Sequence, residues 1–297
     1  MTTALLFLAT VVIWGTTWIA IAAQVGQTPV MVSVFLRFAL AGPLMLAGLA
    51  LLGRLRRPVC WRFVIIQALC LFSFNFIGLY NATRFIPSGL VSVVFSLASI
   101  FNALNARIFF GDKVNARTVL AGAVGVSGLV LIFWTDIFTG AGAATLKGVG
   151  WALMGTLMFS LGTMASRRNN ELGVNALTAN SWGMGAGALV LLGLVVLSGQ
   201  PIRPPAEPVY WGALIYLALI GSVAGFTAYL VLAARIGAVR AGYATVVFPV
   251  IALAVSTIAE GYHWTPLAMT GAAMTIAGNL IMFWPRPAPG SRPAMPD

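Results

Sequence analysis

The sequence contains very few charged residues. Only 8% of its 297 residues are Asp, Glu, Lys or Arg, against roughly 25% in ordinary soluble domains. Hydrophobic residues make up 60% of the chain, and the mean hydropathy is +0.96. A water-soluble fold of this size could not cover its surface with so few polar side chains. The composition therefore excludes a soluble globular protein.

Acidic residues are scarcer than basic ones, with six Asp and Glu against 17 Lys and Arg and a net charge of +11. Such a balance can indicate nucleic-acid binding, but nucleic-acid-binding proteins gather Lys and Arg on a polar face. Here these residues lie in short gaps between apolar runs. We therefore expect no nucleic-acid partner.

Residues that hold metals or carry out catalysis are also rare. Cys60 and Cys70 are the only cysteines, and both fall in one predicted helix about 15 Å apart, too far for a disulfide. His263 is the only histidine, and its position beside Trp264 favours an interfacial role. No metal site, cofactor or catalytic constellation is expected, so a membrane-embedded enzyme is the weaker alternative.

Long apolar runs dominate the rest of the chain. A helix needs about 20 mostly apolar residues to cross the hydrocarbon core, because lipid cannot pair with free backbone groups. Ten stretches meet this requirement, and loops rich in Gly, Pro and Arg separate them. The predicted spans are 3–22, 30–52, 61–81, 88–110, 116–134, 147–166, 174–197, 208–232, 240–259 and 266–284.

Basic residues alternate between the two sets of loops that these spans define. One set has only Arg84, Lys147 and Arg203, whereas the other has Arg54, Arg56, Arg57, Arg62, Arg107, Lys113, Arg117, Arg167, Arg168, Arg235, Arg240, Arg286 and Arg292. Lys and Arg favour the cytoplasmic side, so both termini are expected in the cytoplasm. The excess of arginine over lysine suggests a GC-rich bacterial source and hence the inner membrane.

An internal repeat is visible at a shift of about 150 residues. Gly128–Trp134 overlays Gly278–Trp284 with Gly and Phe-Trp in register, and Gly111 pairs with Gly261. The expected units are residues 1–137 and 145–285, followed by a disordered cytoplasmic tail, 286–297. A repeat of five helices must enter the membrane in the opposite orientation. We therefore predict an all-α integral membrane protein of ten transmembrane helices in two inverted five-helix repeats.

Several short motifs are distributed along the chain from the first span to the last. They are Trp14-Gly15-Thr16-Thr17-Trp18, Phe35-Leu36-Arg37-Phe38, Arg84-Phe85-Ile86-Pro87-Ser88-Gly89, Gly111-Asp112, Arg235-Ile236-Gly237-Ala238-Val239-Arg240-Ala241, Phe248-Pro249 and Glu260-Gly261-Tyr262-His263-Trp264. In this order and spacing the chain resembles the EamA-type branch of the drug/metabolite transporter superfamily. It departs from the family's pattern at Ser99, where proline is usual. Within the family it is most similar to the YddG-type exporters of aromatic and other neutral amino acids.

The resemblance implies a substrate site near the membrane midplane, and a zwitterion would need aromatic faces and a few hydrogen-bonding groups there. Trp14 and Trp18 share one face of the first span. The other substrate-binding candidates are Asn75, Tyr80, Phe95, Ser99, Asn102, Phe159, Tyr216 and Tyr243. Helix packing, interhelical hydrogen bonding or an interfacial aromatic belt would explain the same residues.

Two further residues are candidates for a hinge or gate. Pro249 interrupts the ninth span, where it frees a carbonyl group and bends the helix. Arg37 lies inside the second span, where a charge costs roughly 2.5 to 3.5 kcal/mol by insertion scales. Its guanidinium could reach headgroups or helix-end carbonyls, or it could attract a substrate carboxylate.

The expected function is export of small neutral amphipathic metabolites, aromatic and other neutral amino acids among them, by a monomer in the lipid bilayer. Drugs or other metabolites are the alternative cargo, and a passive channel is the alternative mode. No Asp or Glu falls in the middle of a predicted span. This favours facilitated export, with coupling through Glu260 or His263 as the alternative.

Overall fold

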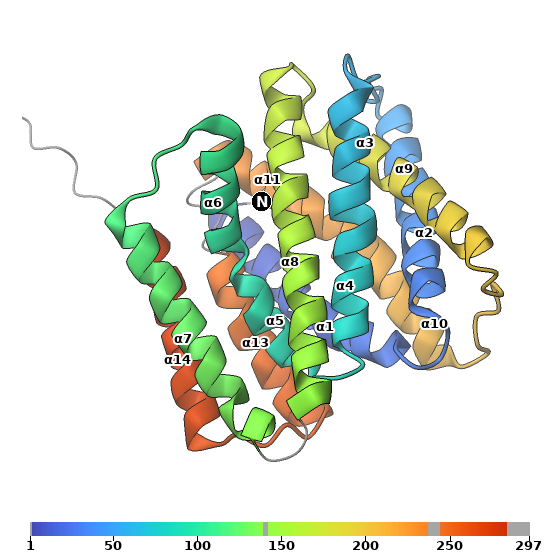
Figure 1. Ribbon diagram of the computed structural model, residues 1–297. Coiled ribbons are helices and arrows are strands. Elements are labelled where there is room, and N and C mark those ends of the chain that lie inside the picture. The colour runs from blue at the N-terminus through green and yellow to red at the C-terminus, as the bar shows by residue number, and fades with distance from the viewer. Residues whose placement is uncertain (1, 139–141, 237–243, 284–297) are drawn as a thin grey trace, which may run out of the picture.

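The computed structural model describes residues 2–138, 142–236 and 244–283. These residues form helices joined by short loops, with no strand among them (Figure 1). Helices satisfy their own backbone hydrogen bonds, as a lipid environment requires. In chain order the elements are α1 (Thr3–Gln24), α2 (Val30–Leu51), α3 (Trp61–Leu69), η1 (Cys70–Phe74), α4 (Asn75–Ala82), α5 (Ser88–Ser96), α6 (Ala98–Phe110), α7 (Ala116–Phe138), α8 (Gly142–Glu171), α9 (Ala176–Leu197), α10 (Pro208–Ile215), η2 (Tyr216–Ala224), α11 (Gly225–Ile236), α13 (Ala244–Ala259) and α14 (Pro266–Phe283).

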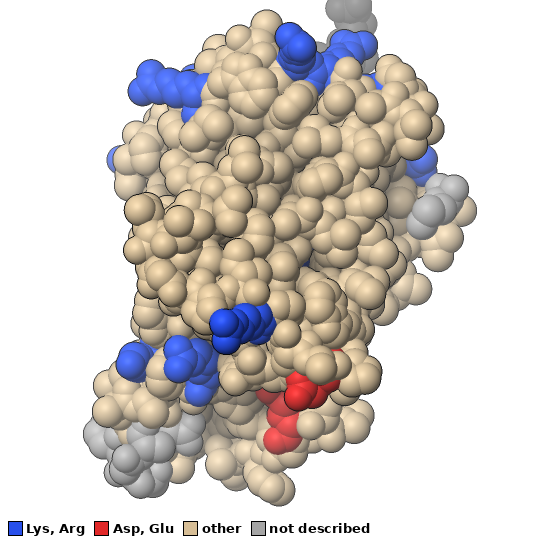
Figure 2. Space-filling view, turned by 90° about the vertical axis from the view of Figure 1, so that its right-hand side faces the viewer, with Lys and Arg blue, Asp and Glu red and all other residues tan. Residues whose placement is uncertain are grey.

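Within the described residues, eight helical stretches are long and apolar enough to cross a membrane. Two more apolar helices, Val247–Ala259 and Pro266–Ile281, are shorter. Figure 2 shows Lys, Arg, Asp and Glu gathered toward the two ends of one face, with a broad uncharged band between them. The expected all-helical fold is confirmed for the described part of the chain, and the count of ten spans stays a prediction.

The expected span 88–110 is two helices, α5 and α6, which meet at Leu97. Serine hydroxyls bond the backbone on either side of this break. Ser96 Oγ donates to the Val93 carbonyl oxygen at 2.7 Å, and Ser99 Oγ donates to that of Ser96 at 3.2 Å. Such bonds compete with the helical hydrogen-bond ladder and bend helices, which accounts for a division that hydropathy does not reveal.

Helices α1 and α8, the first helices of the two halves of the chain, have similar packing partners. Helix α1 packs on α13 and on the α10–η2–α11 stretch, while α8 packs on α5 and α6 and on the α3–η1–α4 stretch. Three further pairs are in close contact: α2 with α9, α5 with α13, and α7 with α14. Each half of the chain therefore contributes one member to every one of these three pairs.

Glycines bring α7 and α14 into backbone contact. A Cβ built on Gly128 would lie 2.5 Å from the carbonyl oxygen of Gly271, and one built on Gly278 would lie 2.7 Å from that of Ala121. The later residue of α7 thus meets the earlier residue of α14, so the two helices run antiparallel. Small residues allow such close approach between membrane helices.

We predict that Gly128→Ala lowers the thermal unfolding temperature of the purified protein in detergent. Its added methyl group must push α7 away from α14, at a cost of about 1–3 kcal/mol typical of overpacking. Gly150→Ala is the matched control, because a Cβ there meets no heavy atom within 4 Å and alanine favours the helix. Equal unfolding temperatures for the two variants would contradict the assignment of this contact.

Candidate functional site

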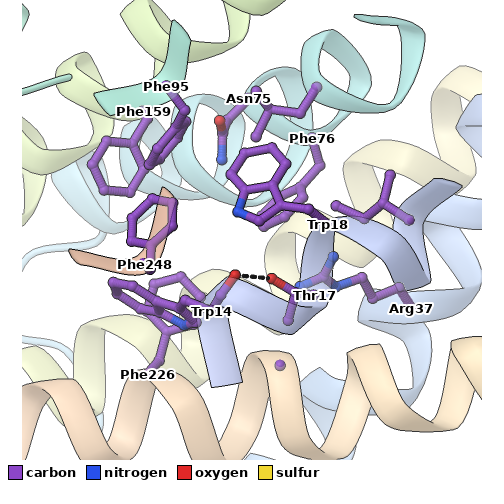
Figure 3. Close-up of a pocket in the computed structure, with 13 residues that line it drawn as sticks. Trp14, Thr17, Trp18, Arg37, Asn75, Phe76, Phe95, Phe159, Phe226 and Phe248 are labelled. Carbon is purple, nitrogen blue, oxygen red and sulfur yellow. Dashed lines mark hydrogen bonds between the residues drawn. The ribbon is translucent and has the colours of Figure 1, made fainter. Parts of the chain in front are cut away.

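A cavity lies where two hydrophobic clusters meet in the interior of the molecule. One cluster contains Trp18, Phe95 and Phe248, and the other contains Ile21 and Phe226. Figure 3 shows the cavity between α1, α2 and the helices that face them. It is lined by Trp14, Thr17, Trp18, Ile21, Arg37, Asn75, Phe76, Leu79, Phe95, Phe159, Gly221, Phe226 and Phe248.

Aromatic rings form most of the cavity wall. Trp18 stacks on Phe248 with ring centroids 6.1 Å apart and meets Phe95 edge-on at 5.6 Å. Phe95 in turn meets Phe159 at 4.7 Å, and Trp14 meets Phe226 at 5.4 Å. Rings contributed by α1, α5, α8, α11 and α13 therefore surround the space (Figure 3), and such a wall suits an apolar or aromatic group.

Arg37 extends from α2 to this cavity and is only 2% exposed. Its Nε donates to Ser222 Oγ at 3.0 Å, and its guanidinium lies over the Phe76 ring, 4.3 Å from the centroid. Nη1 has no hydrogen-bond partner. Within the described residues, no carboxylate forms an ion pair with Arg37. Its positive charge is therefore buried without a counter-charge, which is costly in a low-dielectric interior.

Two other lining residues have buried polar atoms without a partner. They are Nε1 of Trp18, a hydrogen-bond donor, and Oδ1 of Asn75, an acceptor. The Asn75 side chain also donates from Nδ2 to the Leu71 carbonyl oxygen at 3.2 Å. Buried polar groups are almost always paired in native structures. The cavity thus combines two unsatisfied donors, on Arg37 and Trp18, with one unsatisfied acceptor, on Asn75.

Two π-helical segments position the polar residues. Asn75 follows η1 directly, and Ser222 lies within η2. Each segment has a serine that bonds the carbonyl five residues earlier: Ser73 Oγ to Ala68 at 3.1 Å and Ser222 Oγ to Leu217 at 2.9 Å. These serines are about 150 residues apart, the spacing of the sequence repeat. π-Helical turns occur frequently at functional sites.

Six of the candidates predicted from sequence line the cavity: Trp14, Trp18, Arg37, Asn75, Phe95 and Phe159. Pro249 does not line it, but lies in α13 next to Phe248, which does. Tyr243 lies outside the described residues. The structure thus brings together the paired tryptophans, the buried cation and one asparagine.

Four other candidates do not line the cavity. Tyr80 is fully buried beside Arg37 and donates to Gln24 Oε1 at 3.0 Å. Tyr216 Oη lies 2.6 Å from Thr16 Oγ1. Ser99 Oγ donates to Asn279 Oδ1 at 2.8 Å, which joins α6 to α14. Asn102 has a buried Oδ1 without a partner, but it is not a lining residue.

Sequence reasoning missed several lining residues, among them Thr17, Phe76, Phe226 and Phe248. Thr17 lies between the two tryptophans, and its hydroxyl donates to the Trp14 carbonyl oxygen at 2.8 Å. Phe248 precedes the proline already singled out, so its position was a usable signal. Phe76 and Phe226 have no comparable mark, because an apolar ring in an apolar helix is equally suited to lipid.

We predict that Ser222→Ala destabilises the protein more than Ser73→Ala does. Both substitutions remove a buried hydroxyl, but only Ser222 accepts a hydrogen bond from a charged group, and such bonds contribute roughly 1.5–3 kcal/mol. Thermal unfolding of the two variants in one detergent provides the comparison. Equal losses would show that the bond to Arg37 contributes nothing.

Comparison with known proteins identifies relatives over most of the chain. The model of the EamA-like transporter family matches twice, over residues 1–134 and 146–284. The inner membrane transporter YedA of Escherichia coli strain K12, described as uncharacterized, is 26% identical over 253 residues, covering 83% of this chain and 79% of YedA. A "probable terminal-alkyne amino-acid exporter" of Streptantibioticus cattleyicolor is 25% identical over 207 residues, covering 66% of this chain and 64% of the exporter.

A solved crystal structure has the same fold, with a TM-score of 0.67 over 94% of this chain and 96% of that chain, at 17% sequence identity. The relatives are named as transporters, which points away from an enzyme. Two family matches that together span nearly all of the sequence place it in a family of multi-pass membrane proteins. The chain belongs to the EamA-like transporter family.

Proposed function

We propose that this protein exports small neutral amphipathic metabolites, specifically neutral amino acids with an aromatic or other apolar side chain. The observation that carries the proposal is the set of unpaired polar atoms at the cavity: Arg37 Nη1, Trp18 Nε1 and Asn75 Oδ1. A carboxylate would accept hydrogen bonds from the two donors. An ammonium group would donate to the acceptor. Both ends of a zwitterion would thereby be satisfied inside an aromatic wall.

The charge balance of the site supports an amino acid over a cationic drug. Arg37 has no counter-charge among the described residues, so a carboxylate entering the cavity would form a charge-assisted hydrogen bond. A cation without a carboxylate would meet uncompensated repulsion there. The Streptantibioticus cattleyicolor relative, named as an amino-acid exporter, supports the same class of substrate.

Transport requires that the cavity change its size. Its volume is about 50 Å³, whereas sites for small organic ligands usually hold roughly 300 Å³ or more. Side chains or helices must therefore move for an amino acid to enter. This small volume fits a closed stage of an alternating-access cycle, in which the site opens to one side of the membrane at a time.

An inverted arrangement of two five-helix units, residues 1–137 and 145–285, would provide that motion. Three observations support it: the double family match, the antiparallel contact of α7 with α14, and the similar packing of α1 and α8. With helices α13 and α14 counted, ten spans result. The loop arginines then favour both termini in the cytoplasm. By analogy with the inner membrane transporter YedA, the proposed location is the bacterial inner membrane, where the protein would act as a monomer.

Two polar contacts join residues of the two units, one just after the end of α13 and the other just after the end of α6. The Glu260 carboxylate, just after α13, accepts from Ser88 N and Ser88 Oγ at the start of α5, at 3.1 Å and 2.6 Å. It also accepts from Ser256 Oγ at 2.5 Å. A carboxylate at a helix N-terminus accepts hydrogen bonds from the unpaired backbone N–H groups there, so Glu260 joins α13 to the start of α5.

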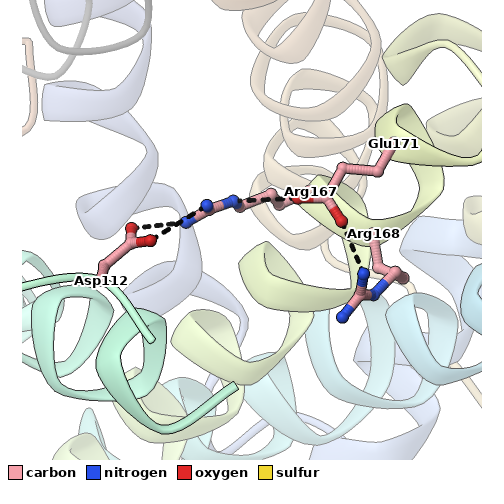
Figure 4. Close-up of polar contacts among 4 residues, drawn as sticks. All are labelled: Asp112, Arg167, Arg168 and Glu171. Atoms are coloured by element: carbon pink, nitrogen blue, oxygen red, sulfur yellow. Dashed lines mark hydrogen bonds and ion pairs between the residues drawn. The ribbon is translucent and has the colours of Figure 1, made fainter. Parts of the chain in front are cut away.

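The other contact follows α6. Asp112 accepts two hydrogen bonds from Arg167 of α8, at 2.7 Å and 3.2 Å, and Arg167 also pairs with Glu171 at 3.4 Å (Figure 4). The hydrogen bond from Arg167 lowers the pKa of the Asp112 carboxyl from its ordinary value, so Asp112 is ionised at neutral pH. We propose that these two contacts are released alternately during the transport cycle.

We predict that Arg37→Gln reduces transport of a neutral aromatic amino acid roughly 10- to 150-fold, as expected for losing a hydrogen bond to a charged group. Transport of the corresponding carboxamide should not fall, because it has no carboxylate for Arg37 to bind and its cationic form is no longer repelled by the guanidinium. Uptake into proteoliposomes measures both. The matched control is Arg84→Gln, at an exposed loop position, which should leave both rates unchanged.

Equal loss of acid and carboxamide transport in Arg37→Gln would instead assign Arg37 to a gate or to folding. Counterflow of labelled substrate with the unaltered protein separates a carrier from a passive channel, because only a carrier exchanges substrate against its own gradient. Absence of counterflow would reject the alternating-access proposal.

If the Glu260 and Asp112 contacts are released alternately, each one should control access to the cavity from its own side of the membrane. The measurement uses a background in which Cys60 and Cys70 are replaced by serine and the lining residue Leu79 by cysteine. An impermeant maleimide then reports access to the cavity. Glu260→Ala should speed this labelling about 2- to 30-fold from the Glu260 side. Asp112→Ala should speed labelling from the opposite side only. Unchanged labelling rates from both sides would contradict the proposal that these carboxylate contacts keep the cavity closed.

A further inference from the structure

A groove on the outside of the molecule lies between the end of α2, the start of α9 and the η2–α11 stretch. Its volume is about 550 Å³, and its wall is mostly apolar. Its apolar lining includes Leu44, Gly48, Leu49, Leu52, Leu177 and Val223. Leu44 and Leu52 are 41% and 69% exposed. In a membrane, the groove would therefore open to lipid.

One end of the groove has a fixed positive charge. Gly53 adopts a left-handed conformation, φ +63°, which ends α2, and the chain then turns back so that Arg54 N donates to the Leu49 carbonyl oxygen at 2.8 Å. This bond places Arg54 at the groove, where it is a lining residue. No carboxylate of the described residues forms an ion pair with it.

The surroundings add further positive charge. Arg56 and Arg57 follow in the same loop, and residues 53–60 include no Asp or Glu. Figure 2 looks onto the side of the molecule where α2, α9 and α10 lie in Figure 1, and it shows Lys and Arg gathered at the upper end of that side. An apolar groove that opens to lipid and ends at unpaired arginine favours an amphiphile with an anionic head.

We propose that this groove binds an acidic glycerophospholipid of the adjacent leaflet, with an acyl chain along α2 and the phosphate at Arg54. Basic pockets between membrane helices bind acidic lipid headgroups in this manner. The site is separate from the aromatic cavity. However, Val223 of the groove is the neighbour of Ser222, the hydrogen-bond partner of Arg37, so the lipid would pack against the element that holds the buried cation.

Native mass spectrometry of the purified full-length protein, titrated with phosphatidylglycerol or phosphatidylcholine, tests the proposal. The unaltered protein should retain phosphatidylglycerol preferentially, and Arg54→Ala should weaken that retention about fivefold. Gly48→Leu should reduce retention of both lipids, because a Cβ at Gly48 meets nothing within 4 Å and a larger side chain would fill the groove. Neither variant alters a lining residue of the aromatic cavity.

Two controls make the result specific to this groove. Gly193→Leu adds the same side chain at another open helical position and should leave retention unchanged, as should Arg84→Ala. Equal retention of the two lipids, or phosphatidylglycerol adducts that survive both Arg54→Ala and Gly48→Leu, would overturn the proposal. So would a dimer mass that Gly48→Leu abolishes, since a second copy of the chain would then occupy the groove.

Discussion

A buried arginine that has no counter-charge among the described residues is the feature on which the account of this protein depends. Arg37 donates to Ser222 and lies over the rings of Phe38 and Phe76, and one of its donors, Nη1, is unsatisfied. Leaving a charged group in this condition costs free energy. An evolved membrane protein can retain such a group when a ligand compensates it for part of the functional cycle, and a substrate carboxylate is the simplest ligand that would do so.

The rest of the fold positions and surrounds this charge. α2 carries Arg37, η2 supplies Ser222, and η1 leads directly into Asn75. Rings from six helices line the cavity, and such an apolar wall strengthens any electrostatic contact formed inside it. Around this centre, glycine contacts such as Gly128 with Gly271 allow helices to approach closely. Hydrogen bonds at helix ends, at Glu260 and Asp112, join the two halves of the sequence.

Sequence patterns were enough to predict the helices and about half of the candidate site. Lipid imposes one rule on every span, so hydropathy locates helices well. Trp14, Trp18 and Asn75 were found because a tryptophan pair on one face and an amide at membrane depth are unusual. Helix rotation is set by tertiary packing, so Tyr80 and Ser99 could not be separated from the lining residues. The π-helical turns likewise depend on contacts between helices, which hydropathy does not encode.

A structure of the protein with a neutral aromatic amino acid bound tests the central claim most directly. The account predicts that the substrate carboxylate lies within about 2.7–2.9 Å of an Arg37 guanidinium nitrogen, with the ammonium toward Asn75 and the side chain among the rings of Trp18, Phe95 and Phe248. A substrate whose carboxylate points away from Arg37, or that binds outside this cavity, would contradict it.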